Sequence, residues 1–228
     1  MDEEFQDSLQ NKACKDMNIL ILNWRDIKHP LAGGAEESLF RHASYWEKKG
    51  ASVQWFSASI PGVKNKETIS GITHIRAGSH YTVHMHCLLY YFKHKVRNPD
   101  IIIDCHHFLP FFTALFFRNV KKIVFIHEIA GKVWFKNISF PVALVGYLLE
   151  PLSLILYRKT QFITVSQSTK KDLTIHKIPA KNIEIVHNGM SKVSVPSYIK
   201  KEKTPTIIFL GRISEDKGIA DAFKAISL

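Results

Sequence analysis

Residues 17–37 read MNILILNWRDIKHPLAGGAEE, and this segment is the most informative about the fold class. An apolar run at residues 18–22 leads into a polar loop that ends in Gly33-Gly34, where a helical pattern begins. In this order of strand, glycine-containing loop and helix, backbone N–H groups and the helix N-terminus face a common point and favour an anion there. The stretch therefore predicts an α/β domain with a ligand at the end of its first strand.

Apolar runs bounded by turn residues recur along the chain, with amphipathic stretches between them. This alternation predicts an α/β fold, a Rossmann-like parallel sheet with helices on both faces. The expected strands cover residues 18–22, 52–57, 73–76, 100–104, 122–127, 162–165 and 184–187, and the expected helices cover 35–49, 82–97, 108–117, 141–157 and 167–176. The dinucleotide fingerprint GxGxxG is absent after the first strand, so a nicotinamide or flavin oxidoreductase is disfavoured.

The chain is expected to divide into four parts. Residues 1–16 form a loose polar tail, because they have neither the basic start nor the apolar centre of a signal peptide. Residues 17–190 form the N-terminal Rossmann-like domain, and residues 191–205, rich in Ser, Lys and Pro, form a linker. Residues 206–228 begin a second, truncated domain of the same kind, with a strand at residues 206–210.

Composition limits the class of partner. The 228 residues are 46% hydrophobic, as in globular proteins, and carry a formal net charge of +11, which favours an anionic partner. No arginine-rich tract, zinc-ligand spacing or RNA-binding signature is present, so nucleic acid is not the expected partner. Cys14, Cys87 and Cys105 are widely spaced and form no CxxC pair, which argues against a disulfide framework and fits a cytoplasmic protein.

One apolar segment, residues 138–157, has about the ~20 residues needed to cross a bilayer. Glu150-Pro151 lies in its middle, where a carboxylate is costly in hydrocarbon and a proline interrupts the helix. We expect a kinked, mostly buried helix pair. The alternative is an element on an anionic membrane surface, with the flanking cations facing lipid headgroups. These cations are Lys132, Lys136, Arg158 and Lys159.

Histidines follow two of the expected strands. His106-His107 and His127-Glu128 each come directly after an apolar run, at the carboxyl end where open α/β sheets bind ligands. A histidine there is suited to form a hydrogen bond with a sugar hydroxyl or a phosphate oxygen. The alternative is a purely structural role, in which the histidine caps the loop. A metal site formed by His106, His107 and His127 is not expected, because no matching carboxylate accompanies them.

Two further loops carry polar residues after apolar runs. Arg212 and Lys217 lie in a glycine-punctuated loop, and an arginine fork with a lysine point charge suits a diphosphate. Taken alone, such residues are more often solvated surface charges than ligand-binding groups. Asn188-Gly189 is a strong turn signal.

The combination of motifs is more specific than any member. The motifs are NWRD (23–26), HP (29–30), GGAE (33–36), FIHE (125–128), TVSQSTKKDL (164–173), IVHNG (185–189) and FLGRISEDKG (209–218). In this order and spacing the chain, from Met17 onward, resembles the retaining nucleotide-sugar glycosyltransferases of family 4, which have the GT-B architecture. In that family two Rossmann-like domains face each other across a cleft, with the acceptor mainly on the N-terminal domain and the donor mainly on the C-terminal one.

The resemblance implies roles for individual residues. Gly33 and Gly34 would approach the donor phosphates or the transferred sugar, and His127 would be the catalytic residue beside that sugar. Arg212 and Lys217 would neutralise the donor diphosphate as it leaves. Further sugar or acceptor contacts would come from Glu36, His106, His107, Glu128, Asn188 and Gly189. Neither a metal nor another cofactor would be required.

Two departures from the family pattern stand out. Asn188-Gly189 is followed by Met190, where the family motif usually ends in an aspartate. The family's pair of glutamates for the donor ribose and sugar would lie beyond Leu228, which would leave half a donor site.

The expected function is therefore that of a hexosyltransferase present as a partial chain. It would transfer a sugar from a nucleotide-sugar to a lipid-linked, polysaccharide or other glycan acceptor, in the cytoplasm and at the inner face of the membrane. The alternative is a non-catalytic acceptor-binding module, subunit or relic that needs a separate C-terminal chain to complete the cleft.

Overall fold

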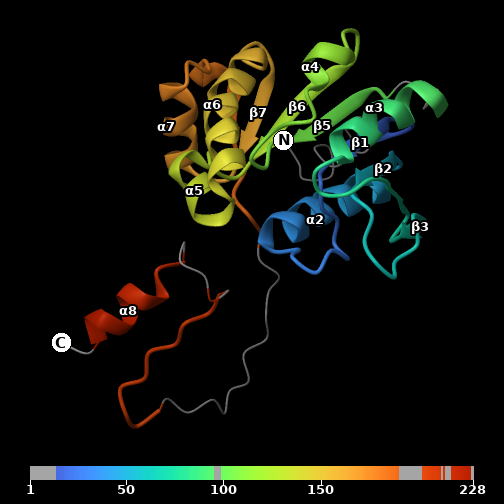
Figure 1. Cartoon of the computed structure of the whole chain (residues 1–228). Helices are drawn as coiled ribbons and strands as arrows, with labels where there is room; N and C mark the ends of the chain where they lie inside the picture. Colours follow the sequence, from blue (N-terminus) through green and yellow to red (C-terminus); the bar gives the residue numbers. More distant parts are fainter. Residues whose placement is uncertain (1–13, 95–98, 190–201, 212, 214–216, 227–228) are drawn as a thin grey trace, which may run out of the picture.

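A computed structural model describes residues 14–94, 99–189, 202–211, 213 and 217–226 (Figure 1). Within these residues eight strands form one sheet in the order β3-β4-β2-β1-β5-β6-β7-β8. All neighbouring pairs are parallel except β3 and β4. The strands are β1 Asn18–Leu22, β2 Ser52–Ser57, β3 Lys66–Ile69, β4 Ile72–Arg76, β5 Ile101–Cys105, β6 Lys121–Ile126, β7 Gln161–Thr164 and β8 Ile183–Ile185.

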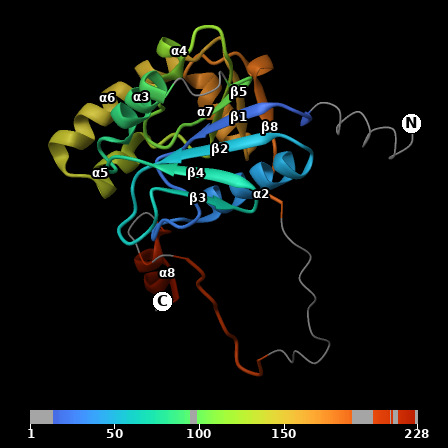
Figure 2. The same ribbon diagram turned by 90° about the vertical axis from the view of Figure 1, so that its right-hand side faces the viewer.

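Helices cover both faces of this sheet, because its strands are apolar on both sides. On β1, Ile19 and Ile21 join a core with α2, whereas Leu20 and Leu22 join a second core with α3. Figure 2 shows α2 and α3 on opposite sides of the central strands. The helices are α2 Gly34–Lys48, α3 Val83–His94, α4 Thr113–Phe116, α5 Trp134–Asn137, α6 Phe140–Leu156, α7 Gln167–Ile175 and α8 Ile219–Ile226. The predicted α/β fold, a parallel sheet covered on both faces, is confirmed.

The helix expected at residues 108–117 is mostly a loop. Asp104 at the end of β5 accepts hydrogen bonds from the backbone N–H of Phe111 at 2.9 Å and from the hydroxyl of Thr113 at 2.6 Å. Phe108 and Phe112 have φ angles of 67° and 55°, which no α-helix tolerates. Only α4 remains helical, since the buried carboxylate supplies the backbone partners that a longer helix would have provided.

The segment 138–157 contains one long helix, α6, and the expected kinked pair is wrong. Pro151 lies inside α6, and only one face of the helix is buried, with Ala143, Gly146, Glu150, Ser153 and Leu154. The expectation of a mostly buried segment is wrong as well, because α6 covers the sheet with a single face. The exposed apolar side chains of α6 include Phe140, Val142, Val145, Leu148, Leu149 and Leu152.

No helix formed by the described residues has both the length and the apolar character required to cross a bilayer.

The strand expected at residues 206–210 is absent from the described structure. Ile207, Ile208 and Leu210 are exposed, Leu210 by 97%, and the segment lies outside the sheet (Figure 1). A strand needs neighbours for its backbone N–H and C=O groups, and none of the eight described strands pairs with this segment. Most of the expected tail and linker, residues 1–13 and 191–201, lies outside the described residues.

Candidate functional site

The direction in which strands are added to the sheet reverses at β1. Strands β2 and β4 extend the sheet on one side of β1, and β5 to β8 extend it on the other. Such a switch point leaves a crevice at the carboxyl ends of the strands. Leu22 of β1 is in register with Asp104 of β5, and Cys105 is in register with Phe125 of β6. The residues that follow these three strands therefore lie along one edge.

A small cavity of about 30 Å³ lies at this edge. Its walls come from the ends of β1, β5 and β6 and from the first turns of α2. The lining residues are Asn23, Ala35, Glu36, Leu39, Cys105, His106, His107, Phe108, Phe125, His127, Glu128 and Ala130. Five residues predicted for the site thus meet here, namely Glu36, His106, His107, His127 and Glu128.

Glu36 fixes the glycine loop to the loop after β1. Its Oε2 accepts the backbone N–H of Gly33 at 2.8 Å, which is the glutamate half of a capping box at the start of α2. Its Oε1 accepts Arg25 Nε at 3.0 Å, and Arg25 also donates to the carbonyl of Leu31 at 2.8 Å. Because both charged side chains are largely buried, this pair sets the position of the loop relative to the cavity.

Gly33 and Gly34 come immediately before the cavity residues Ala35 and Glu36. Gly33 is extended, with φ −142°, and a Cβ atom added to either glycine would meet no atom within 4 Å. Neither position therefore needs glycine for a turn or for packing within the described fold. The space in front of α2 is open to a ligand that approaches the backbone closely.

His127 presents an unpaired nitrogen to this region. Its Nε2 is buried and has no hydrogen-bond partner among the described residues, and the same holds for His106 Nδ1 and Asn23 Oδ1. Thr169 donates its hydroxyl to the carbonyl of His127 at 2.8 Å and so fixes the backbone. Burial lowers the pKa of His127, so the ring is neutral at pH 7 and able to donate or accept one hydrogen bond.

The two histidines after β5 differ in their surroundings. His106 Nε2 lies 3.1 Å from the hydroxyl of Ser153 on α6, and burial lowers its pKa to about 4. His107 Nε2 lies 3.5 Å from a guanidinium nitrogen of Arg25. Burial, and then the positive charge of Arg25, lower the pKa of His107 to about 3. Both rings are neutral at pH 7, and they present hydrogen-bonding groups without charge.

Across the described part of the chain, no group of three or more His, Cys, Asp and Glu side chains is arranged to hold a metal ion.

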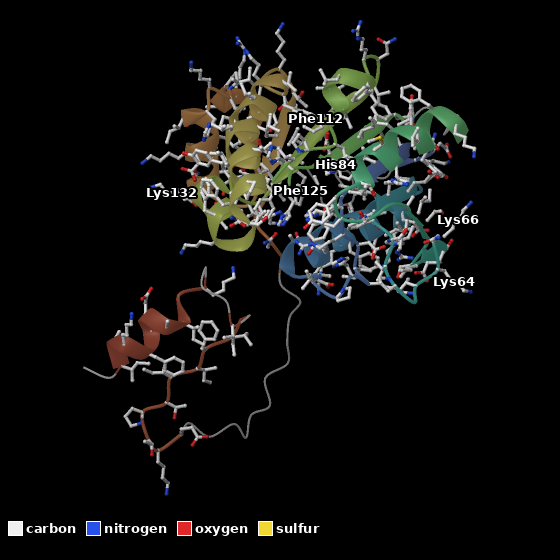
Figure 3. All side chains as sticks on the ribbon, in the orientation of Figure 1. Lys64, Lys66, His84, Phe112, Phe125 and Lys132 are labelled. Carbon is white, nitrogen blue, oxygen red and sulfur yellow. The ribbon has the colours of Figure 1, made fainter. Side chains whose placement is uncertain are left out.

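A larger cavity of about 500 Å³ adjoins the small one, and His107, Phe108 and Glu128 line both. Its further lining residues are Trp24, Arg25, Leu31, His80, Tyr81, His84, Leu109, Val133, Trp134, Ile138, Val142, Val145, Gly146, Leu149 and Lys217. Figure 3 shows His84 toward the centre of the folded part and Lys132 at its periphery. The prediction missed His80 and His84, since they precede and begin α3 and follow no strand directly.

The remaining predicted residues are spread more widely. Asn188 Oδ1 accepts the hydroxyl of Ser38 on α2 at 2.8 Å, so the Asn188-Gly189 turn lies beside α2 without lining either cavity. Lys217 lines the larger cavity. Arg212 and Met190 lie outside the described residues.

Comparison with known proteins gives one family match. The model of Glycosyltransferase Family 4 matches residues 32–192. No curated protein sequence is a significant match.

Similar solved structures include two trehalose-phosphate synthases. The α,α-trehalose-phosphate synthase (UDP-forming) of Burkholderia xenovorans is 10% identical with a TM-score of 0.40, over 68% of this chain and 41% of that one. The α,α-trehalose 6-phosphate synthase of Burkholderia multivorans is 13% identical with a TM-score of 0.40, over 70% and 42%. A short chain dehydrogenase of Leptospira borgpetersenii is 14% identical with a TM-score of 0.36, over 71% and 76%. The chain thus spans about two fifths of the length of the two synthases.

Proposed function

The chain belongs to Glycosyltransferase Family 4. We propose that the protein transfers a sugar from a nucleotide-sugar donor to a glycan or lipid-linked acceptor with retention of configuration. The observation that carries the proposal is the group of unpaired polar atoms around one cavity at the switch point of the sheet. These atoms belong to Asn23, His106 and His127. A sugar, with hydroxyl groups on every side, is a ligand that satisfies several such atoms together.

In this proposal His127 lies beside the transferred sugar. Its neutral ring holds a sugar hydroxyl by one hydrogen bond, and the backbone at Gly33-Gly34 approaches the donor. The bond between the anomeric carbon and the diphosphate breaks, and the acceptor oxygen bonds to that carbon on the same face. The acceptor hydroxyl passes its proton to the oxygen of the departing diphosphate. Arg212 and Lys217 compensate the charge that develops on the diphosphate, so a metal is not required.

The division of the chain follows from the same proposal. Residues 17–190 form the acceptor-side domain, residues 191–205 form the linker, and residues 206–228 begin the donor-side domain. We place the protein at the inner face of a membrane, where the exposed apolar side of α6 contacts lipid. Lys132, Arg158 and Lys159, all exposed near its two ends, suit anionic headgroups. In a flotation assay the chain is expected to rise with vesicles containing phosphatidylglycerol, and its failure to do so would remove this placement.

The function itself is tested by sugar transfer. The chain, alone and with a separately expressed C-terminal domain, is incubated with radiolabelled nucleotide-sugars and a membrane extract as the source of acceptors. The proposal is supported by transfer that His127→Ala lowers about a hundredfold. The NMR spectrum of the product should show the donor's anomeric configuration. Inversion of configuration would contradict the retaining mechanism. Binding of acceptor without transfer or donor hydrolysis under either condition would favour the non-catalytic module.

A further inference from the structure

The larger cavity has two chemically different ends. At one end Trp24, His84 and His107 bring indole and imidazole groups together, beside Arg25. At the other end Val142, Val145 and Leu149 of α6 form an aliphatic wall. These three positions fall on one side of the helix, since they are separated by three and four residues. The cavity therefore offers hydrogen bonds at one end and hydrocarbon at the other.

The polar end holds donors and acceptors that the fold leaves unpaired. Trp24 Nε1 and His84 Nε2 are buried and have no hydrogen-bond partner within the described residues. The rings of His80 and His107 lie 4.3 Å and 5.8 Å from the Trp24 ring and fix its orientation. Burial lowers the pKa of His84, so both unpaired groups are uncharged at neutral pH. Uncharged, fixed groups of this kind match hydroxyl groups of a ligand.

Contacts between Trp134 and α6 fix the wall of the cavity between its two ends. Trp134 packs directly on the backbone of α6, because a Cβ atom on Gly146 would lie 2.2 Å from its ring. The indole N–H of Trp134 donates to Glu150 at 3.1 Å, and Glu150 also accepts the backbone N–H of Ala130 at 2.8 Å. The loop after β6 is thereby tied to α6, which keeps the polar and the aliphatic ends in one continuous cavity.

The aliphatic end opens onto the outer surface of the molecule. Val145 lines the cavity and is still 56% exposed, and Leu148 and Leu152 beyond it extend the exposed apolar surface of α6. A free sugar would place its hydroxyl groups against this wall and leave them unsatisfied. A ligand with a polar head and a hydrocarbon chain satisfies both ends. The volume of about 500 Å³ lies within the usual range for small-molecule sites.

We propose that this cavity is the acceptor site and that the acceptor is a lipid-linked hydroxyl compound. Its polar head lies against Trp24, His84 and His107, and its hydrocarbon chain leaves between Val142, Val145 and Leu149 toward the outer surface of α6. The inference rests on the proposed function, of which it names the acceptor class.

The test measures binding without any donor, so its outcome is independent of sugar transfer. The probe is decyl glucoside, used below its micelle concentration and compared with free glucose by isothermal titration calorimetry. Val145→Gln is matched with Leu148→Gln, because the two side chains are 56% and 57% exposed on the same helix and only Val145 lines the cavity. We expect decyl glucoside to bind at least tenfold more tightly than glucose, and Val145→Gln to weaken it about tenfold while Leu148→Gln leaves it unchanged.

Three results would overturn the inference. Equal affinity for glucose and decyl glucoside would show that the decyl group contributes nothing to binding. Equal losses in the two variants would show adsorption on the outer surface of α6 in place of binding in the cavity. Efficient transfer to a water-soluble oligosaccharide that has no hydrocarbon chain would show that the acceptor need not be lipid-linked. The proposed function would still stand.

Discussion

The Asp26 carboxylate, on the loop after β1, lies 2.5 Å from the Arg76 guanidinium at the end of β4, and neither side chain is exposed. Arg76 also pairs with Glu67 of β3 at 2.6 Å, and Ser57 donates its hydroxyl to Asp26 at 3.2 Å. A buried ion pair therefore connects the loop that begins at Asn23 to the end of β4, two strands away in the sheet. This arrangement holds the walls of both cavities in place without using a residue that faces them.

Asp26→Asn is expected to destabilise the protein by about 3 kcal/mol, because it removes the fully buried carboxylate and leaves the Arg76 guanidinium with the partly exposed Glu67 as its countercharge. The matched control is Glu37→Gln, which removes an exposed ion pair with Arg41 on α2 and should cost about 0.5 kcal/mol or less. Urea unfolding followed by circular dichroism measures both. Equal costs for the two variants would show that the buried pair contributes no more than a surface pair.

The same pair makes stability depend on pH. Burial alone would raise the pKa of Asp26, but His74, whose Nδ1 lies 3.4 Å away, and the hydrogen bond from Arg76 outweigh it and lower the pKa from 3.8 to about 2. The unfolded state therefore takes up the proton first, and the stabilisation present above pH 4 is lost as the pH falls toward 2. The advantage of the wild type over Asp26→Asn should shrink by about 2 kcal/mol between pH 5 and pH 2. A constant difference in unfolding free energy across that range would contradict the lowered pKa.

Gly34→Ala separates a binding role of the glycine loop from a structural one. An added methyl group meets no atom of the fold at this helix start, so stability should stay the same or rise by about 0.5–1 kcal/mol. If the donor approaches this backbone, the same methyl group should raise the KM for the nucleotide-sugar about tenfold or more, a loss of about 1.4 kcal/mol. Thermal unfolding and initial rates measure the two effects. Unchanged kinetics would leave the loop without a role in donor binding.

The apolar strands were predictable from the sequence because both faces of a covered parallel strand are buried over most of its length. β1 shows this directly, with Ile19 and Ile21 on one face and Leu20 and Leu22 on the other. The start of α7 follows a local rule too, because serine is a typical N-cap residue and the hydroxyl of Ser166 accepts the backbone N–H of Thr169 at 3.1 Å. In each case the signal is local, since it depends on neighbours in the sequence.

The features that the sequence did not reveal depend on contacts between distant residues. β3 has the sequence KETI, with no apolar run, and it is held by the pairing of Glu67 with Arg76. His106 and His127 were predictable as site residues because they follow strands whose ends share an edge. His84 lies in α3, and only the packing of α3 on the sheet brings it to the larger cavity.

His127→Ala is expected to lower the rate of transfer about a hundredfold, within the range found when one catalytic hydrogen-bonding group is removed. His42→Ala is the control, because the rings of His42 and His127 both pack on Phe125, and only His127 lines the small cavity. The pKa of His127 is lowered below 6.5, so the rate should be constant with pH above that value and fall where the ring gains its proton. A rate unaffected by the substitution would exclude His127 from the reaction.

Trp24→Phe tests the head-group end of the larger cavity by removing one N–H group while keeping an aromatic ring. The indole nitrogen of Trp24 is buried without a partner in the described structure, so its loss should leave stability unchanged or slightly increased.

Trp55→Phe is the contrasting variant, because the indole of Trp55 donates to the carbonyl of Arg25 at 3.1 Å and its loss should cost about 1 kcal/mol. Affinity for decyl glucoside, measured by calorimetry, should fall about fivefold to tenfold in Trp24→Phe, as expected for one hydrogen bond of about 1 kcal/mol. Trp55→Phe should retain that affinity at temperatures where it is folded. If Trp24→Phe loses stability and keeps its affinity, the indole N–H has a partner within the protein and does not serve the acceptor.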